Sequence, residues 1–315
     1  MEPAVRHLRF QITHTTGGVE QSHYLDLARC LSLVNRRLYQ QGREYFVKKV
    51  TVTDRDNQNG LISIGAAGSS WPVHQGWKMA KKMWDEMRQG HGGAPGSGLP
   101  TSITPAKWSD FKVWLSDDHR SAGIGAELLP IDNGNNVVDT TNSEWNHATY
   151  YSPDGTTGAD EFEVHLLGAH NGSAGSRTSV GVVQAYEDAR RTVQVDDSGD
   201  QIDTDSPWIN LFDDGTTLDE IAAGMITEGD FPPYALERYP GAGNNLPKPL
   251  VMGLAAIVPN FGPAGKTSTV VLGGFSAPCG LLEIETQSSE SANQLDVIIE
   301  LAAGDYKGIK APSME

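Results

Sequence analysis

Long apolar runs are missing from this chain of 315 residues. No stretch reaches the roughly 18 consecutive apolar residues that a membrane-spanning helix needs, so we expect no membrane partner. The opening stretch "MEPAVRHLRFQIT" has no apolar core of the kind found in secretory signals, so secretion is not indicated.

Cysteine is also scarce. The chain has two, Cys30 and Cys279, which lie far apart in the sequence, and neither belongs to a spacing typical of a zinc site. Because unpaired cysteines are usually buried, we expect two buried free thiols. A disulfide between them is the less favoured alternative.

Apolar residues make up only 38% of the chain, which also contains 35 Gly and 17 Pro. This composition favours many short strands joined by turns over long helices. The strand candidates are "RHLRFQIT", "YFVKKVTVT", "LISIG", "EFEVHLLGAH", "RTSVGVVQAY", "RRTVQV", "PLVMGLAAIV", "TSTVVLGGF", "CGLLEIETQ" and "LDVIIELAAG". Their number predicts a mainly β fold, a single jelly roll (an eight-stranded β-sandwich) that occupies residues 1–315 as one domain.

Apolar residues at steps of three and four predict helices inserted in the connections between these strands. The predicted helices lie near residues 22–41, 73–89, 104–116 and 216–226. The first is expected to begin at Ser22 and to stop at Gly42, since serine is a good helix cap and glycine ends helices.

The charge of the chain is unevenly distributed. The formal net charge is −16, yet residues 1–120 hold 16 basic and 11 acidic residues, a net of +5, and the remaining 195 residues carry −21. The stretch "NRRLYQQGREYFVKK", residues 35–49, has five cations against Glu44 alone. We therefore predict two electrostatic faces, one turned toward a polyanion and one toward water.

Segments that resemble catalytic motifs fail on their details, so we expect no enzyme. "NFGPAGKTS", residues 260–268, lacks the first glycine of a phosphate-binding loop and precedes a strand, which favours a hairpin loop. His165 would share the outer face of a strand with Glu161 and Glu163, where a polar surface is favoured over a metal site. No spacing singles out a nucleophile with its base.

An acidic cluster offers the best oxygen ligands for a cation. Its members are Asp196, Asp197, Asp200, Asp203 and Asp205. Calcium requires six to eight converging oxygens, so a solvated acidic loop is favoured, with a calcium site as the alternative and no other cofactor expected.

Several segments carry a family resemblance. "YLDLARCLSLVNRRLYQQGREYFVKKVTV" and "SIGAAGSSWPVHQGWKMAKKMWDEM" resemble the N-terminal half of capsid proteins of environmental, largely marine, circular Rep-encoding single-stranded DNA viruses. "GDFPPYALERYPGA", "GGFSAPCGLLEIET" and "LAAGDYKGIKAP" agree in order, so the resemblance covers most of the chain.

This resemblance implies a coat protein of the virion that self-assembles into a small icosahedral shell around circular single-stranded DNA. The basic residues would then contact phosphates on the inner surface without reading sequence. They are Arg36, Arg37, Arg43, Lys48, Lys49, Lys78, Lys81, Lys82 and Arg88. The alternative is that these cations are the solvated sides of amphipathic helices. One departure from the family is that residues 1–20 hold only Arg6 and Arg9 instead of a long basic arm.

Two other classes of function stay open at this point. The first is a jelly-roll carbohydrate-binding module or glycan-active enzyme that uses surface tryptophans and paired acids, either Asp213 with Asp214 or Glu161 with Glu163. The second is a calcium-dependent adhesion or spike-type protein that uses the acidic loop at 195–205.

Overall fold

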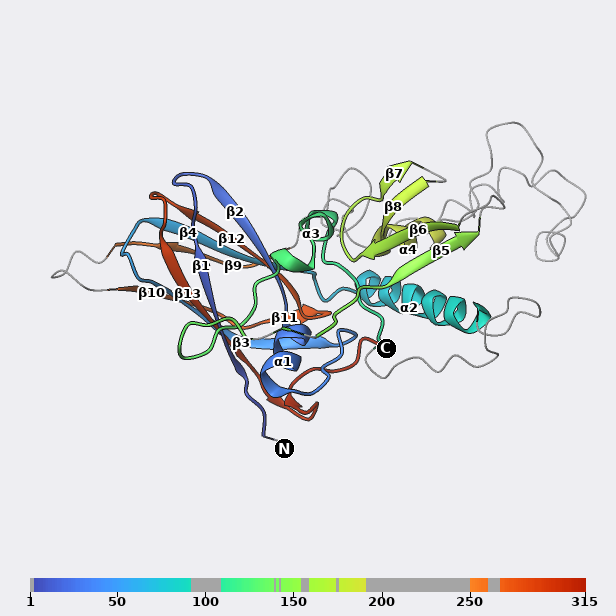
Figure 1. Cartoon of the computed structure of the whole chain (residues 1–315), viewed down its shortest axis with the longest axis horizontal. Coiled ribbons are helices and arrows are strands. Elements are labelled where there is room, and N and C mark those ends of the chain that lie inside the picture. Colours follow the sequence, from blue (N-terminus) through green and yellow to red (C-terminus); the bar gives the residue numbers. More distant parts are fainter. Residues whose placement is uncertain are drawn as a thin grey trace, which may run out of the picture.

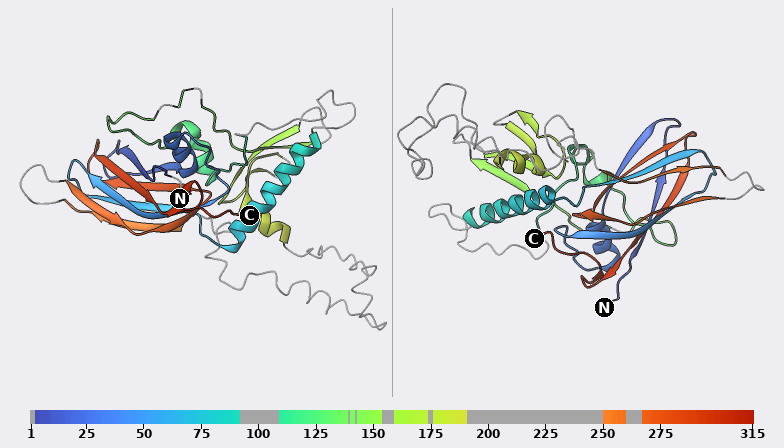
Figure 2. Two further views of the ribbon diagram at one scale, coloured as in Figure 1. Left: turned by 90° about the horizontal axis from the view of Figure 1, so that it is seen from below. Right: turned by 180° about the vertical axis from the view of Figure 1, so that it is seen from behind.

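A β-sandwich and a smaller body of strands and helices lie side by side in the computed structural model (Figure 1). The structure describes residues 3–91, 109–138, 140–141, 143–153, 159–173, 176–190, 250–259 and 267–315. Two further views show the same arrangement, with the C-terminus where the sandwich meets α2 (Figure 2).

Two mainly antiparallel sheets form the sandwich. The first has the order β1 (His7–Thr13), β13 (Gln294–Leu301), β3 (Glu44–Asp54) and β10 (Ser268–Leu272), and β11 (Phe275–Pro278) also pairs with β3. The second has the order β2 (Glu20–Asp26), β12 (Leu281–Ser288), β4 (Gly60–Ala66) and β9 (Leu250–Ile257). The predicted mainly β fold is confirmed, and its two antiparallel sheets are compatible with the predicted β-sandwich.

The strand pairing has a mirror order along the chain. β1 pairs with β13, β2 with β12, β3 with β10 and β4 with β9, all antiparallel. Each of the first four strands of the sandwich therefore lies beside one of its late strands, in reverse order along the chain. Phe10, for example, lies opposite Val297.

The sandwich core follows from the alternation of side chains along each strand. Leu8, Phe10 and Ile12 are buried while their neighbours in β1 are more exposed. They pack with Val52 and Val297 and with the other inward-facing side chains of both sheets. Truncating a buried phenylalanine such as Phe10 to alanine typically costs about 3–5 kcal/mol, so this face alone contributes substantially to stability.

The connection between β4 and β9, residues 67–249, contains the smaller body. Its described elements are α2 (Trp71–His91), α3 (Asp117–Ala122), a 3₁₀ turn (Ile124–Ala126), β5 (Thr149–Pro153), β6 (Ala159–His165), β7 (Asn171–Ser173), β8 (Ser176–Gly181) and α4 (Val182–Arg190). The four strands form a sheet in the order β5-β6-β8-β7. Trp77, Trp84 and Phe111 form its core together with Cys279 and Met314, so the smaller body shares buried side chains with the C-terminal region. The short strands β14 (Ala303–Gly304) and β15 (Gly308–Ile309) pair near the C-terminus.

The first predicted helix is only half right. Residues 20–26 form β2, and α1 covers Leu27–Asn35, because Asp26 rather than Ser22 caps the helix through bonds from the amides of Ala28 and Arg29. The helix ends at Arg36, which takes a left-handed conformation with φ of 51°. The pairing of β2 with β12 overrides the helical periodicity of this segment.

The other predicted helices have different outcomes. The helix near 73–89 is confirmed as α2. The helix predicted near 104–116 is wrong over the described residues 109–116, which form no helix. The amide of Trp114 donates a hydrogen bond to the carbonyl of Val164 in β6, and Trp114 forms an isolated β-bridge with His165. The helix near 216–226 lies outside the described residues. "RTSVGVVQAY" is a strand only to Gly181 and then becomes α4.

Most of the segment 260–268, predicted to be a hairpin loop, lies outside the described residues, but the strands on its two sides do not pair with each other. The strand before it, β9, pairs with β4, and the strand after it, β10, pairs with β3, so the two belong to opposite sheets. Cys30 and Cys279 are both free and buried, as predicted. None of the helices in the described ranges has the length and apolarity that crossing a membrane requires.

Candidate nucleic-acid interface

The outward side of the first sheet gathers cations from distant parts of the chain. Because Leu8, Phe10 and Ile12 point into the core, Arg9 points outward from β1, beside Ile298 of β13. Five cations and two carboxylates make up this surface, which we call the basic sheet face: Arg9, Lys48, Lys49, Arg55, Lys310, Asp296 and Glu300. The formal net charge of this set is +3.

Each carboxylate of the basic sheet face is shared by two cations. Asp296 lies 3.4 Å from Arg9 and 2.6 Å from Arg55. Glu300 lies 2.7 Å from Lys48 and 3.4 Å from Lys49, and the hydrogen bond from Lys48 is the main cause of the lowered pKa of Glu300. Both sites therefore keep one positive charge in excess, which suits a phosphate backbone.

A bulge explains why two neighbouring lysines face the same way. Residues next to each other in a strand normally point to opposite sides of the sheet. The register of β3 against β13 shifts between Glu300 and Leu301, and Lys48 and Lys49 are both exposed. A bulge adds one residue to one strand of a pair, so both ammonium groups reach the same carboxylate.

The outward side of the second sheet has the opposite charge. Its strands β2, β12, β4 and β9 contain no lysine or arginine. On this side lie Glu20, which is exposed, Glu285, which is partly exposed, and Glu283, which is buried, and we call these three the acidic sheet face. Burial raises the pKa of Glu283, and Glu285 accepts a hydrogen bond of 2.8 Å from Ser63. The two sides of the sandwich thus differ in the sign of their charge.

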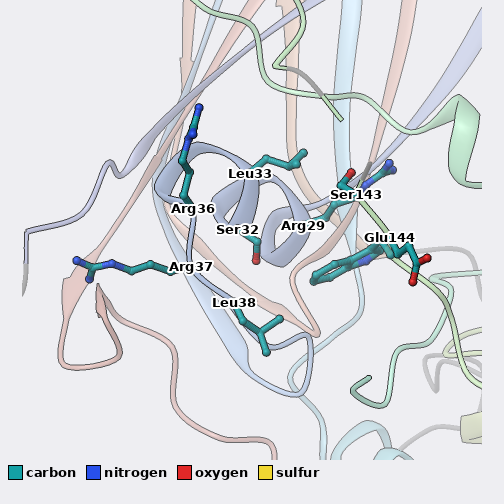
Figure 3. A pocket seen from close by; sticks show the side chains of 9 residues that line it. Arg29, Ser32, Leu33, Arg36, Arg37, Leu38, Ser143 and Glu144 are labelled. Carbon is teal, nitrogen blue, oxygen red and sulfur yellow. The ribbon is translucent and has the colours of Figure 1, made fainter. Parts of the chain in front are cut away.

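Arg36 and Arg37 lie apart from the basic sheet face, at the end of α1. They line a hollow of about 460 Å³ together with Arg29, Leu38 and Trp145. In Figure 3 the two guanidinium groups point in different directions and do not converge on one spot. Cations at a helix C-terminus also stabilise its exposed carbonyls, so their position has a structural explanation besides DNA contact.

Arg43 packs against the C-terminal region. Its guanidinium lies 3.6 Å from the centre of the Tyr306 ring and donates a bond of 3.0 Å to the carbonyl of Ala311. Stacking on a ring and bonding to a carbonyl hold this segment in place. Arg43 is therefore engaged within the chain.

The lysines of α2 form a further group. Lys81 lies 3.2 Å from Asp85 and 2.7 Å from Glu315, and Lys82 lies 3.8 Å from Glu86. Lys78 lines a surface hollow together with Lys81, Lys82 and Glu315. The side chain of Arg88 lies outside the described part of the chain. Acids one turn along the helix offset much of this positive charge.

The structure thus places the described side chains of the predicted cations in four separate regions, and it adds members that the sequence did not reveal. Arg9, Arg55 and Lys310 are distant from Lys48 and Lys49 in the sequence or separated from them by the strand. They join this surface through tertiary contacts: Arg9 by the pairing of β1, Arg55 by its ion pair with Asp296 and Lys310 by lying over the ring of Phe46. For Arg9 a signal was present, because it alternates with apolar residues in its strand.

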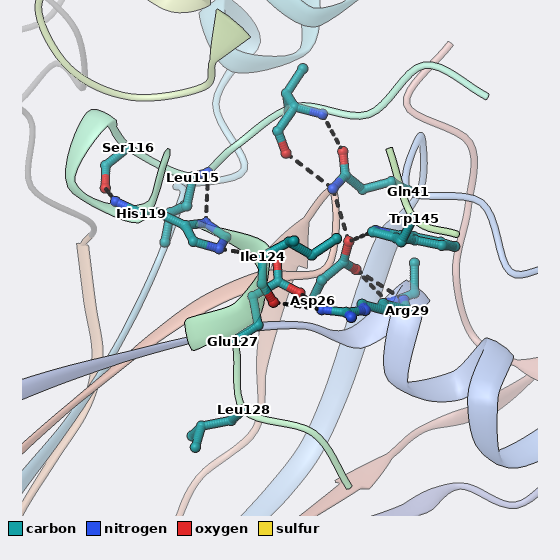
Figure 4. A network of polar contacts seen from close by, with 12 residues as sticks. Asp26, Arg29, Gln41, Leu115, Ser116, His119, Ile124, Glu127, Leu128 and Trp145 are labelled. Atoms are coloured by element: carbon teal, nitrogen blue, oxygen red, sulfur yellow. Dashed lines mark hydrogen bonds and ion pairs between the residues drawn. The ribbon is translucent and has the colours of Figure 1, made fainter. Parts of the chain in front are cut away.

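A buried polar network ties α1 to the rest of the molecule (Figure 4). The carboxylate of Asp26 accepts bonds from the amides of Ala28 and Arg29, from Gln41 at 2.9 Å and from Trp145 at 3.0 Å. Burial, followed by the nearby Glu127, raises the pKa of Asp26 to about 6. The network therefore joins the start of α1 to the segments that contain Gln41 and Trp145.

The ion pair between Arg29 and Glu127 belongs to the same network. Their atoms Nη1 and Oε2 lie 2.6 Å apart, and Glu127 also lies 3.2 Å from Nε2 of His119. The side chains of Glu127 and His119 are fully buried. A buried carboxylate needs partners, and Glu127 has both Arg29 and His119.

His165 does not face outward as predicted. It is fully buried, with Nδ1 2.5 Å from the hydroxyl of Ser179 and Nε2 3.0 Å from the carbonyl of Ala169. Burial lowers its pKa to about 4. The pair resembles a nucleophile and its base, but Ser179 is buried too, so a substrate has no access to it.

The acidic cluster at Asp196, Asp197, Asp200, Asp203 and Asp205 lies outside the described residues, as do Asp213 and Asp214. Within the described ranges, no group of three or more His, Cys, Asp or Glu side chains is placed to hold a metal ion. Glu163 lies 3.9 Å from Arg120, and Glu161 is exposed.

Comparisons with known proteins give no match, whether to family models, to curated sequences or to solved structures.

Proposed function

We propose that this chain is the coat protein of a virus with a circular single-stranded DNA genome, and that it assembles into a small icosahedral shell. The basic sheet face would turn inward to the DNA and the acidic sheet face outward. The observation that carries the proposal is the opposite charge of the two sides of one sandwich.

The strand order supports a single jelly roll as the fold of the sandwich. A jelly roll is two four-stranded sheets made by rolling up a long antiparallel hairpin. The pairs β1–β13, β2–β12, β3–β10 and β4–β9 have that order. Viral coat proteins are one of the classes built on this fold, although a fold alone does not assign a function.

The chemistry of the basic sheet face supports contact with phosphates and not with bases. Two cations share each carboxylate of this face, so either cation of a pair can leave the carboxylate and bind a phosphate oxygen instead. Thr51, Thr53 and Thr269 lie in the same rows of the sheet and offer hydroxyl groups. Such a surface binds single-stranded DNA independently of its sequence, and its affinity for DNA falls as the salt concentration rises.

The other two functions find less support. A glycan-active enzyme needs two acids across a cleft, and Glu161 and Glu163 follow one another on the same side of β6, with Glu163 facing Arg120. A calcium-dependent adhesion protein would rest on the acidic cluster, which lies outside the described residues.

Negative-stain electron microscopy of the purified recombinant protein tests the proposal. Uniform closed spheres are the expected result. Particles should carry nucleic acid when made in cells, measured as a raised ratio of absorbance at 260 and 280 nm. A protein that stays monomeric at all concentrations, or that forms only irregular aggregates, contradicts the proposal.

A further inference from the structure

One flank of the sandwich is apolar and carries no charge in the strands that the structure describes there. It is formed by the edge strands of the two sheets, β9 and β10, which lie next to each other. Five of the ten exposed large apolar side chains in the described residues lie on or next to these strands. Leu61, Val251, Leu254 and Val258 are on the outward side of the second sheet, and Val271 is on the outward side of the first. Val251, Leu254, Val258 and Val271 are each about 60% exposed.

This flank lacks the usual protection of sheet edges. Edge strands of soluble proteins normally carry charges or prolines that prevent pairing with other chains. β9 reads "LVMGLAAI" and β10 reads "STVVL", with no charged residue and no proline. An apolar concentration of this kind marks an interaction surface.

The opposite flank carries charged and polar side chains. It consists of β1 and β2, where His7 and Arg9 on one strand and Glu20 on the other are polar and charged. Two copies that met through β1 and β2 would place these charges at the contact. Two copies that met through β9 and β10 would bury no charged side chain of these two strands, so the apolar flank is complementary to itself.

We infer that the β9–β10 flank is the surface through which a second copy of this chain binds, in a contact around a twofold axis. This inference rests on the proposed function, because an icosahedral shell contains twofold axes. In a twofold contact the same patch serves both partners, so an uncharged, apolar patch meets its own equivalent. The flank therefore supplies one of the contacts that close the shell.

Single substitutions on the flank test the inference. Leu254→Lys and Val251→Lys each place a charge on an exposed site, so the subunit should keep its fold and its melting temperature. Val137→Lys is the matched control, since Val137 is 58% exposed and lies away from β9 and β10. The readouts are electron microscopy and light scattering coupled to size-exclusion chromatography.

We expect shells from the wild type and from Val137→Lys, and folded subunits without shells from Leu254→Lys. Shells from Leu254→Lys and Val251→Lys alike would overturn the inference and leave the proposed function standing. If the wild type forms dimers but no shells, and Leu254→Lys is a monomer, the result would support the contact and overturn the proposed function. A wild type that stays monomeric overturns both.

A cross-linking experiment identifies the occupant. Cys30 and Cys279 are the only cysteines of the chain and both are buried, so an added cysteine is the sole accessible thiol. Among Val251→Cys, Leu254→Cys and Val258→Cys, at least one should form a covalent dimer in higher yield than Val137→Cys, because positions near a twofold axis meet their own copies. Equal, low yields at all four positions, or binding of the flank to phosphatidylcholine vesicles without self-association, would exclude a second copy.

Discussion

The Nε atom of Arg55 lies 2.6 Å from the carboxylate of Asp296, although 241 positions separate the two residues in the sequence. Asp296 also faces Arg9 from the neighbouring strand β1. One acid therefore orders two cations from different strands on the outward side of the sheet. This arrangement and its counterpart around Glu300 supply four of the five cations of the basic sheet face.

Replacing Lys48 and Lys49 together by glutamine should weaken the binding of single-stranded DNA. Each cation that contacts a phosphate contributes about 0.7 to the slope of log K against log salt for single strands, so the double variant should lower that slope by about 1.4. Fluorescence anisotropy with an oligothymidylate at several salt concentrations measures it.

The control for this pair is Lys82→Gln, because Lys82 is exposed on α2 and lies beside Glu86. It should leave the slope nearly unchanged if the basic sheet face carries the contact. A larger effect from Lys82→Gln than from the double variant would instead place the DNA on α2.

Removing one partner of the buried pair Arg29–Glu127 should destabilise the protein strongly. Arg29→Met leaves the buried carboxylate of Glu127 without its closest cation, and such a loss typically costs about 3–5 kcal/mol. Urea unfolding measures the difference. Lys82→Met, which breaks an exposed pair, should cost no more than about 1 kcal/mol. The double variant Arg29→Met with Glu127→Leu should recover part of the lost free energy of unfolding. If Arg29→Met and Lys82→Met lower the free energy of unfolding equally, the buried network is not important for stability.

Asp26 should make a pH-dependent contribution to stability. Its pKa in the folded protein is about 6, above the usual value of 3.8, so the folded state binds this proton more tightly than the unfolded state does. The contribution is fully present below about pH 4 and is lost as the pH rises to about 6. The free energy of unfolding of the wild type, relative to that of Asp26→Asn, should therefore fall between pH 4 and pH 6 and stay constant above.

Asp132 provides the control of opposite sign. The amide of Asn136 and its side chain lower the pKa of this exposed carboxylate, so its contribution is present above pH 4 and lost in acid. A difference between the wild type and Asp26→Asn that does not change with pH would show that Asp26 titrates as an ordinary surface acid.

Gly274 should be intolerant of a side chain. A Cβ atom at this position would lie 2.7 Å from the carbonyl oxygen of Lys48 and 2.9 Å from that of Val47, at the bulge that orients the two lysines. Gly274→Ala should therefore lower stability by about 1–3 kcal/mol through overpacking. Gly273→Ala is the adjacent control, since nothing lies within 4 Å of its added Cβ. Equal melting temperatures for the two variants would contradict the close approach.

The local pattern of the sequence predicted much of the architecture. The alternation in "RHLRFQIT" identified β1 and its inward face, and the apolar stripe of residues 73–89 identified α2. Both signals are local, because a strand or an amphipathic helix separates its apolar residues by a fixed period. Burial of Cys30 and Cys279 was equally predictable, from the general preference of free cysteines.

Segments with two competing signals were decided by their partners. Residues 22–26 fit a helical stripe, yet they pair with β12 and form a strand. Residues 109–116 fit a helix as well, but the backbone of Trp114 bonds beside β6. Periodicity cannot reveal such pairing, because the partner strand is more than 250 residues away in the first case.

The sequence by itself determined the class of the fold, the alternation of its strands and the excess of positive charge in the first 120 residues. Only the tertiary structure decided which cations share a surface: it separated Arg36 from Lys48 and brought Arg9, Arg55 and Lys310 to the same sheet face. The physical reason is that strand pairing and the bulge at Lys48 depend on backbone hydrogen bonds between distant segments, and no local pattern of residues encodes those bonds.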